Sequence, residues 1–261
     1  MNTAKVWLKF AAITMQHEMA YRWNFMIKLI ADGFFSFVQP IMTAIIYLNS
    51  NGLPGWSFGQ ILLLQGIGTI AYGISATIFG RFADHTIQDV RNGLFDMKMT
   101  RPAHPLLYQL ATSCSLENSA ALISGVVIAI YAAGLLDLTL SLWNFLAFLF
   151  ILFLSQIFLF SLEVLVASLG FLVVKSFILL DFFYSLTNVG DYPISIYGGL
   201  GMMLFTFVFP IGLASFYPAS AILGRLSLTT LIELAITAFA FLGFSLILWR
   251  LGIKKYQSAG G

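Results

Sequence analysis

Hydrophobic residues form long blocks along this chain, and short polar intervals separate the blocks. Six blocks have about 20 residues or more, the length that a helix needs to cross a hydrocarbon core of about 30 Å. Their hydrophobicity is continuous, whereas the strands of a membrane barrel alternate. The pattern predicts an all-α membrane protein with six transmembrane helices, at about residues 29–48, 59–80, 114–134, 142–174, 196–216 and 228–248.

The residues before the first block follow a different pattern. A narrow polar line recurs at spacings of four, three and four, and apolar side chains cover the remaining surface. The line consists of Lys5, Lys9, Ala12 and Gln16. Such a helix lies in the membrane surface with its cationic side chains at the headgroups. We therefore expect an amphipathic interfacial helix at residues 3–21; a buried spanning helix is the alternative, which the two lysines disfavour.

Proline residues mark where two blocks are interrupted. Pro40 is predicted to kink the first span. Pro210 and Pro218 indicate a broken helix or a re-entrant segment near the end of the fifth block, before the last helix. Residues 176–188 are apolar but too short to cross, so we expect an interfacial or buried helix there.

The second block, residues 59–80, carries a surface of small residues. Its members are Gly66, Gly68, Ala71, Gly73, Ser75 and Ala76. Small residues let helix backbones approach closely in a membrane. The block lacks a strict Gly-x-x-x-Gly pair, so the pattern predicts close packing and signals a dimerising face only weakly.

The longest interval without a hydrophobic block is residues 81–105. Its first half has an apolar stripe at spacings of four, three and four, made by Ala83, Ile87, Val90 and Leu94. This stripe predicts a short amphipathic helix. Gly93 stands where such a helix would end in a left-handed cap, and Arg101-Pro102 favours extended backbone afterwards. Composition alone leaves two readings open: a solvated connection, or a contact site for another protein.

Composition and charge agree with a membrane protein. Of 261 residues, 59% are hydrophobic and 9% are charged, whereas about 25% are charged in soluble domains. Basic residues gather before the first span, in the second loop, and after the fourth and sixth spans, and only Arg225 falls on the opposite side. The positive-inside rule then puts both termini and the loop at 81–113 in the cytoplasm. Scattered basic residues predict no nucleic-acid surface.

Most motifs of soluble catalysis are absent from the sequence. It contains no Gly-x-x-x-x-Gly-Lys-Ser/Thr phosphate loop, no His-Glu-x-x-His and no Gly-x-Ser-x-Gly. Cys114 is the single cysteine, and His17, His85 and His104 are far apart. We therefore expect no enzymatic activity, metal site or bound cofactor in this chain.

Glu163 is the deepest acidic candidate in the predicted spans. A charge at the centre of a membrane helix costs about 2.5 to 3.5 kcal/mol on insertion scales, so this residue must face protein or water. Two interpretations remain open. Glu163 lines a translocation path, or it is a structural carboxyl that accepts hydrogen bonds from a neighbouring helix.

Four stretches, in this order and topology, resemble the transmembrane permease subunit of a type-2 ATP-binding-cassette (ABC) exporter of the bacterial six-span branch. They are Tyr21-Arg22; residues 87–102, read as Ile-x-x-Val-Arg-x-Gly followed by Arg-Pro; Phe209-Pro210 through Tyr217-Pro218-Ala219; and Tyr256-Gln257-Ser258-Ala259-Gly260. The six-span plan with its amino-terminal helix extends the likeness over the whole chain, as a single permease domain.

The resemblance implies a dimer with a second permease, identical or related, in the bacterial cytoplasmic membrane. Two ABC ATP-binding subunits would hold ATP and Mg, and the loop at 81–113 would couple to them. The implied coupling residues are Ile87, Val90, Arg91, Gly93, Arg101 and Pro102. Arg91 would be a charged contact, Gly93 the cap and Arg101-Pro102 the stiff return to the membrane. Residues 210–226 would form a re-entrant extracellular hairpin.

The apolar walls fit an amphipathic or lipid-like cargo better than a sugar or an ion. Two other classes remain. A secondary transporter would show paired, inverted broken segments, and only one break appears, late in the chain. A membrane scaffold would recruit a soluble partner through residues 81–105. Co-purification of an ABC ATPase with this chain discriminates among these classes.

Overall fold

The computed structural model describes residues 20–101, 104–136, 138, 140–172 and 176–256, together with residues 9, 12, 13 and 16; for 176–180 it describes the backbone alone. All regular elements in these ranges are helical. The α-helices are α2 (Arg22–Phe35), α3 (Val38–Asn49), α4 (Phe58–Ile78), α5 (Phe82–Arg91), α6 (Phe95–Met99), α7 (Pro105–Thr112), α8 (Ser119–Leu135), α9 (Leu142–Gly170), α10 (Ser176–Thr187), α11 (Gly198–Met203), α12 (Phe216–Ile222) and α13 (Leu228–Lys255). Short turns of other helix types are η1 (Leu116–Asn118), η2 (Asn188–Asp191), η3 (Ile194–Tyr197), η4 (Leu204–Val208) and η5 (Ile211–Leu213).

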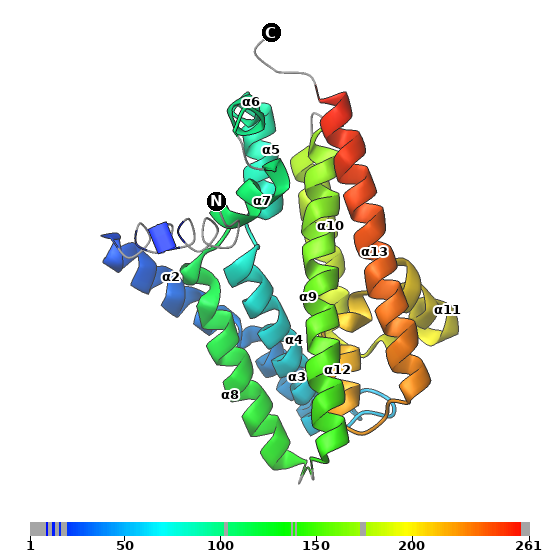
Figure 1. The fold of residues 1–261 in the computed structure, drawn as a ribbon. Coiled ribbons are helices and arrows are strands. Elements are labelled where there is room, and N and C mark those ends of the chain that lie inside the picture. The colour runs from blue at the N-terminus through cyan, green and yellow to red at the C-terminus, as the bar shows by residue number, and fades with distance from the viewer. Residues whose placement is uncertain are drawn as a thin grey trace.

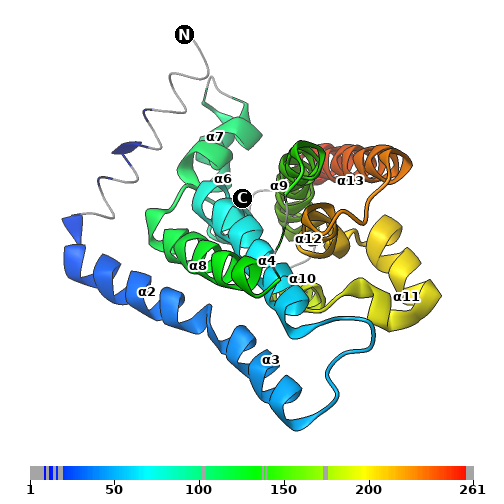
Figure 2. The same cartoon turned by 90° about the horizontal axis from the view of Figure 1, so that it is seen from below.

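Five described helices are long and apolar enough to cross a membrane, and there are six if the bent pair Ile194–Val208 and Ile211–Ile222 is one span. Figure 2 shows α2 and α3 along one edge of the molecule, α9 and α13 along another, and α4 with α8 between them. An all-α membrane protein is therefore confirmed, and the sixth span depends on the bent pair.

The first span, Arg22–Asn49, is interrupted between α2 and α3. Pro40 lies in the first turn of α3. A proline ring clashes with the carbonyl group four residues earlier, which here belongs to Ser36. The helix is interrupted at Ser36 and Phe37, and the clash explains this position, while the kink predicted from Pro40 stays a prediction.

Helices α4 and α8 pack with their backbones in close contact. A Cβ atom added at Gly66 would lie 2.7 Å from the Ala129 backbone nitrogen, and one at Gly73 would lie 2.5 Å from that of Leu122. These separations are too short for any side chain. The close approach predicted for the small-residue surface at 59–80 is confirmed, and its partner is α8 of the same chain.

The loop between α4 and α8 is closed at its base by hydrogen bonds. The Ser115 N–H donates to the Thr77 carbonyl at 2.9 Å, and the Asn118 side chain donates to the Ala76 carbonyl at 3.1 Å. The last carbonyl groups of a helix have no intrahelical donor, so these bonds satisfy the end of α4. The two spans therefore form a stem beneath α5, α6 and α7.

The segment before α13 bends by 79° at Phe209 and Pro210. Pro210 lacks the backbone N–H that would continue the helix, so the predicted break is confirmed. Pro218 does not break a helix, because it lies in the first turn of α12, where backbone N–H groups lack partners anyway. A broken span and a re-entrant loop share this bent shape, so the re-entrant hairpin stays a prediction.

Helix α10 confirms the short helix expected at 176–188, and it packs against α9 and α5. The interfacial helix predicted at 3–21 falls mostly outside the described residues. Lys175, which ended the predicted fourth span, also lies outside them. Figure 1 shows α5, α6 and α7 at the same end of the molecule as the end of α13.

The close contact between α4 and α8 predicts that a side chain added at Gly73 lowers the stability of the protein. Gly73→Ala forces the two helices apart, and we expect a loss of about 1 to 3 kcal/mol, seen as a lower thermal midpoint of the purified protein. Gly134→Ala on α8 is the matched control, because an added Cβ there meets nothing within 4 Å. Equal midpoints for the two variants would contradict the packing.

Candidate functional site

Helix α5 is amphipathic and lies on the end of α9. Ala83 and Ile87 are buried, and Val90 packs partly buried against the core. A Cβ at Gly170 of α9 would lie 2.7 Å from Cγ1 of Ile87. The predicted stripe is confirmed at these positions. Leu94 differs, because it follows the end of α5 and is 43% exposed.

A Schellman motif ends α5 at Gly93. Gly93 has φ of 69°, its N–H donates to the Val90 carbonyl at 3.3 Å, and the Leu94 N–H donates to the Asp89 carbonyl at 2.8 Å. An added Cβ would meet nothing within 4 Å, so the backbone conformation alone favours glycine. The left-handed cap predicted at Gly93 is confirmed.

A polar network ties α5, α6 and α7 together. Lys98 on α6 forms an ion pair with Asp89 on α5 and donates to Oε1 of Gln109 on α7 at 2.6 Å. The Gln109 amide is buried and donates to the Asp89 carboxylate at 3.4 Å. Lys98 and Asp89 are also largely buried, so salt screens their attraction little. The three short helices therefore form one unit.

The return from α6 to α7 is held by a cation–π contact. The Arg101 guanidinium lies 4.7 Å from the centre of the Tyr108 ring. His104 then caps α7, and its Nδ1 accepts a hydrogen bond from the Leu106 N–H at 3.3 Å. Pro102, predicted to stiffen this return, lies outside the described residues.

Glu163 holds the start of α5. Its Oε2 accepts the backbone N–H of Ala83 at 2.9 Å, and its Oε1 accepts the Tyr184 hydroxyl of α10 at 2.9 Å. The first N–H groups of a helix have no intrahelical acceptor, and the positive end of the helix dipole attracts an anion. These contacts support the structural interpretation, while a role in the translocation path stays a prediction.

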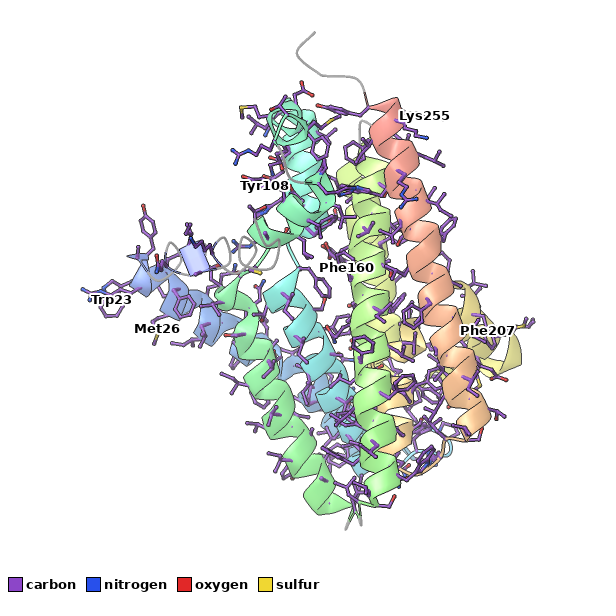
Figure 3. All side chains as sticks on the ribbon, in the orientation of Figure 1. Trp23, Met26, Tyr108, Phe160, Phe207 and Lys255 are labelled. Carbon is purple, nitrogen blue, oxygen red and sulfur yellow. The ribbon has the colours of Figure 1, made fainter. Side chains whose placement is uncertain are left out.

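The depth of Glu163 explains how a carboxylate is tolerated there. It lies about 32 Å along α9 from Leu142, and the hydrocarbon core is about 30 Å thick. If Leu142 lies at one boundary, Glu163 lies at the other. Phe160, one turn earlier, packs against Phe79 and Phe82 with ring centres 5.4 and 5.9 Å apart, where α4 meets α5 (Figure 3).

An aromatic cluster joins α5 and α6 to the ends of α9 and α13. Trp249 of α13 lies 5.4 Å from Phe82 and 6.3 Å from Phe95, measured between ring centres, and Phe171 lies 4.9 Å from Phe95. Tyr256 closes the cluster, 5.6 Å from Phe95. Burial raises the pKa of the Tyr256 phenol to about 12, so the cluster stays uncharged at neutral pH.

Arg81, directly before α5, connects it to the first span. Its guanidinium and the Lys28 ammonium of α2 share the Glu117 carboxylate, at 2.8 and 2.5 Å. Glu117 is buried. The contact between α2 and the start of α5 runs through this carboxylate, so it depends on all three residues.

The outer surface of this unit is exposed and partly apolar. We call it the α5–α6 tip and define it as Arg91, Leu94, Met97 and Met99. Leu94, Met97 and Met99 are 43%, 59% and 44% exposed, and Arg91 is exposed as well. Exposed apolar side chains that cluster with a charge mark contact surfaces. Among the described residues, no group of three or more His, Cys, Asp or Glu could hold a metal ion.

The structure brings five of the predicted coupling residues into this unit: Ile87 and Val90 on the side facing the core, Gly93 in the cap, and Arg91 and Arg101 on the surface. Sequence reasoning missed Lys98, Asp89 and Gln109 as a network. Opposite charges nine residues apart give no helical signal, so only the fold of the loop could reveal this pairing.

A family model described as ABC-2 family transporter protein matches residues 19–260 of the chain. No curated protein and no solved structure matches it.

The contacts of Glu163 generate a second prediction. Glu163→Ala leaves the Ala83 N–H and the Tyr184 hydroxyl buried without an acceptor, at about 1 to 3 kcal/mol each. We expect a lower thermal midpoint and faster proteolysis within residues 82–112. Glu163→Gln keeps an acceptor for Ala83, and its amide can donate to the Tyr184 oxygen, so this variant should retain most of the stability.

A transport measurement on the Glu163→Gln variant distinguishes the two interpretations of Glu163. A structural carboxyl predicts that stability and transport change together in both variants. A well-folded Glu163→Gln protein that has lost transport would instead assign the charge of Glu163 to the translocation path.

Proposed function

The chain belongs to the ABC-2 family of transporter proteins, and from this premise we propose that it works as an exporter, dimerises with a second permease, and couples to its ATPase through the α5–α6 tip. It is a permease component of an ABC transporter. Proteins of this family are transport subunits, and a separate subunit hydrolyses ATP.

The α5–α6 tip is the contact with the ATP-binding subunits. The observation that carries this proposal is an exposed, partly apolar surface on helices too short to cross a membrane, of 10 and 5 residues. Exposed apolar side chains that gather on one short unit are typical of a surface that a partner covers. The exposed Arg91 guanidinium adds a charged contact at the rim of this surface.

Three connections carry a displacement of α5 into the spans. Ala83 is bonded to Glu163 of α9, and Ile87 packs against Gly170 of the same helix. Phe82 packs against Trp249 of α13. Arg81 reaches α2 through Glu117. ATP-driven closure of two ATP-binding subunits, which hold ATP and Mg, would therefore push on α2, α9 and α13 together.

The second permease, identical or related, covers the first span and the segment around α11. Only 6% of the apolar window of Arg22–Asn49 is buried within the chain, against 61% for the second span. Leu200 of α11 is also strongly exposed. The second span contributes less to the dimer, because α8 and other parts of the same chain already cover it.

Orientation and cargo follow from charge and composition. Basic residues flank the ends that carry α5, α6, α7 and the end of α13, which supports a cytoplasmic side with both termini in a bacterial cytoplasmic membrane. The cargo is amphipathic or lipid-like, because most residues of the spans are apolar.

Substitutions at the tip test the coupling proposal. Arg91→Glu reverses the charged contact, and Gly93→Val places a β-branched residue at positive φ, which costs about 1 to 2 kcal/mol. In the complex with its ATPase, we expect both variants to lower stimulated ATP hydrolysis and transport severalfold, with membrane insertion unchanged.

Gly55→Val is the matched control for Gly93→Val. Gly55 has φ of 76°, and an added Cβ there, as at Gly93, meets nothing within 4 Å; it lies in the loop between α3 and α4, away from the tip. Coupling should survive Gly55→Val. If Gly93→Val and Arg91→Glu both retain full activity, the tip is not the coupling element.

A further inference from the structure

A cavity of about 590 Å³ opens at the end of the molecule opposite the α5–α6 tip. Its walls come from the loop between α3 and α4, from Ile194–Val208, from α12 and from the start of α13. Figure 3 labels Phe207, one of its lining residues, beside α13. This volume lies within the range of about 300 to 1,000 Å³ typical of small-molecule sites.

Two opposite charges line this cavity without pairing. Arg225 precedes α13, Glu233 lies on its second turn, and both are exposed. Within the described part of the chain, neither side chain forms an ion pair. Because both side chains are exposed and face one cavity, both are available to a ligand.

The Arg225 guanidinium is held in place by an aromatic ring. It lies 4.9 Å from the centre of the Trp56 ring. Trp56 is itself fixed, because its Nε1 donates to the Ser195 hydroxyl at 3.1 Å and its ring packs 5.8 Å from that of Phe216. The cation is therefore positioned by the protein and still open to an anion.

Glu233 has the opposite environment. It lies about 8 Å along α13 from Leu228, at the depth where headgroups meet hydrocarbon. No side-chain donor reaches its carboxylate among the described residues, and the other charged residues of α13 are at the far end of that helix. An unpaired carboxylate at this depth calls for a cation or water.

The remaining lining divides into hydroxyl groups and apolar side chains. Thr206 and Tyr217 form a hydroxyl pair at 2.7 Å. Beside them lie the apolar residues Met202, Met203, Phe207, Leu226 and Leu234. Methionine side chains adapt to flexible apolar ligands. The cavity thus combines an anion site, a cation site and a surface for hydrocarbon.

We propose that this cavity binds a zwitterionic phospholipid-like amphiphile. Its phosphate lies against the Arg225 guanidinium, its ammonium group lies against the Glu233 carboxylate, and an acyl chain lies along Met203 and Phe207. A purely anionic lipid would satisfy Arg225 and leave Glu233 unpaired, whereas a cationic amphiphile would do the reverse. The zwitterion satisfies both groups.

Native mass spectrometry of the purified permease, titrated with defined lipids, tests this site. We expect phosphatidylethanolamine to bind about tenfold tighter than phosphatidylglycerol. Arg225→Gln should weaken both lipids about tenfold. Glu233→Gln should remove the preference for phosphatidylethanolamine and leave phosphatidylglycerol unaffected.

Arg250→Gln and Asp181→Asn are matched controls, because both residues are exposed and neither lines the cavity. They should bind both lipids as the wild type does. Unchanged phosphatidylethanolamine binding in Arg225→Gln, or a preserved lipid preference in Glu233→Gln, would overturn the proposal. Soluble glycerophosphoethanolamine, which lacks acyl chains, should bind at least tenfold more weakly than phosphatidylethanolamine. Equal binding of the two would contradict an amphiphilic ligand and indicate a soluble zwitterion.

This inference deepens the proposed amphipathic cargo and rests on the proposed function for any transport step. Binding is measured on the permease without its ATPase, so it can fail while coupling through the tip succeeds. Conversely, lipid binding can be normal while Arg91→Glu and Gly93→Val leave ATP hydrolysis unaffected. That outcome would support the lipid site and contradict coupling through the tip.

Discussion

The arrangement of the short helices α5, α6 and α7 depends on one buried carboxylate. Glu163 occupies the start of α5, where backbone N–H groups have no acceptor within the helix, and it also accepts the Tyr184 hydroxyl. A helix of 10 residues is marginal by itself in water, so its position must come from such tertiary contacts. Gly170 adds the second condition, since only a residue without a side chain allows Ile87 to approach α9 so closely.

The two ends of the molecule differ in how their charged side chains are paired. At the end that carries α5, α6 and α7, ionic groups are paired internally, as in Lys98 with Asp89 and Glu117 with its two cations. At the other end, Arg225 and Glu233 face a common cavity, and neither forms an ion pair with a residue that the structure describes. An ion pair fixes the positions of both side chains, whereas a charged side chain without an ion pair can still bind a group of opposite charge.

Local chemistry made much of the fold predictable from sequence. The lengths of the hydrophobic blocks predicted the spans. Pro210 predicted the break before α12 and Gly93 predicted the end of α5, because these residues act on the backbone within a few positions. The partners of Glu163 could not be assigned in the same way. Ala83 is 80 residues away in the chain, and the choice between a path and a structural bond depends on which helices become neighbours. Leu94 fitted the helical stripe by spacing, yet the cap at Gly93 turns the chain before that residue can join the buried face.

The glycine contacts between α4 and α8 have a mechanical consequence. Two backbones in direct contact cannot slide or bend separately, and hydrogen bonds close the same hairpin next to α5. The pair therefore acts as a lever about 32 Å long. A tilt of about five degrees at the end next to α5 displaces the opposite end by about 3 Å without unwinding any turn of helix.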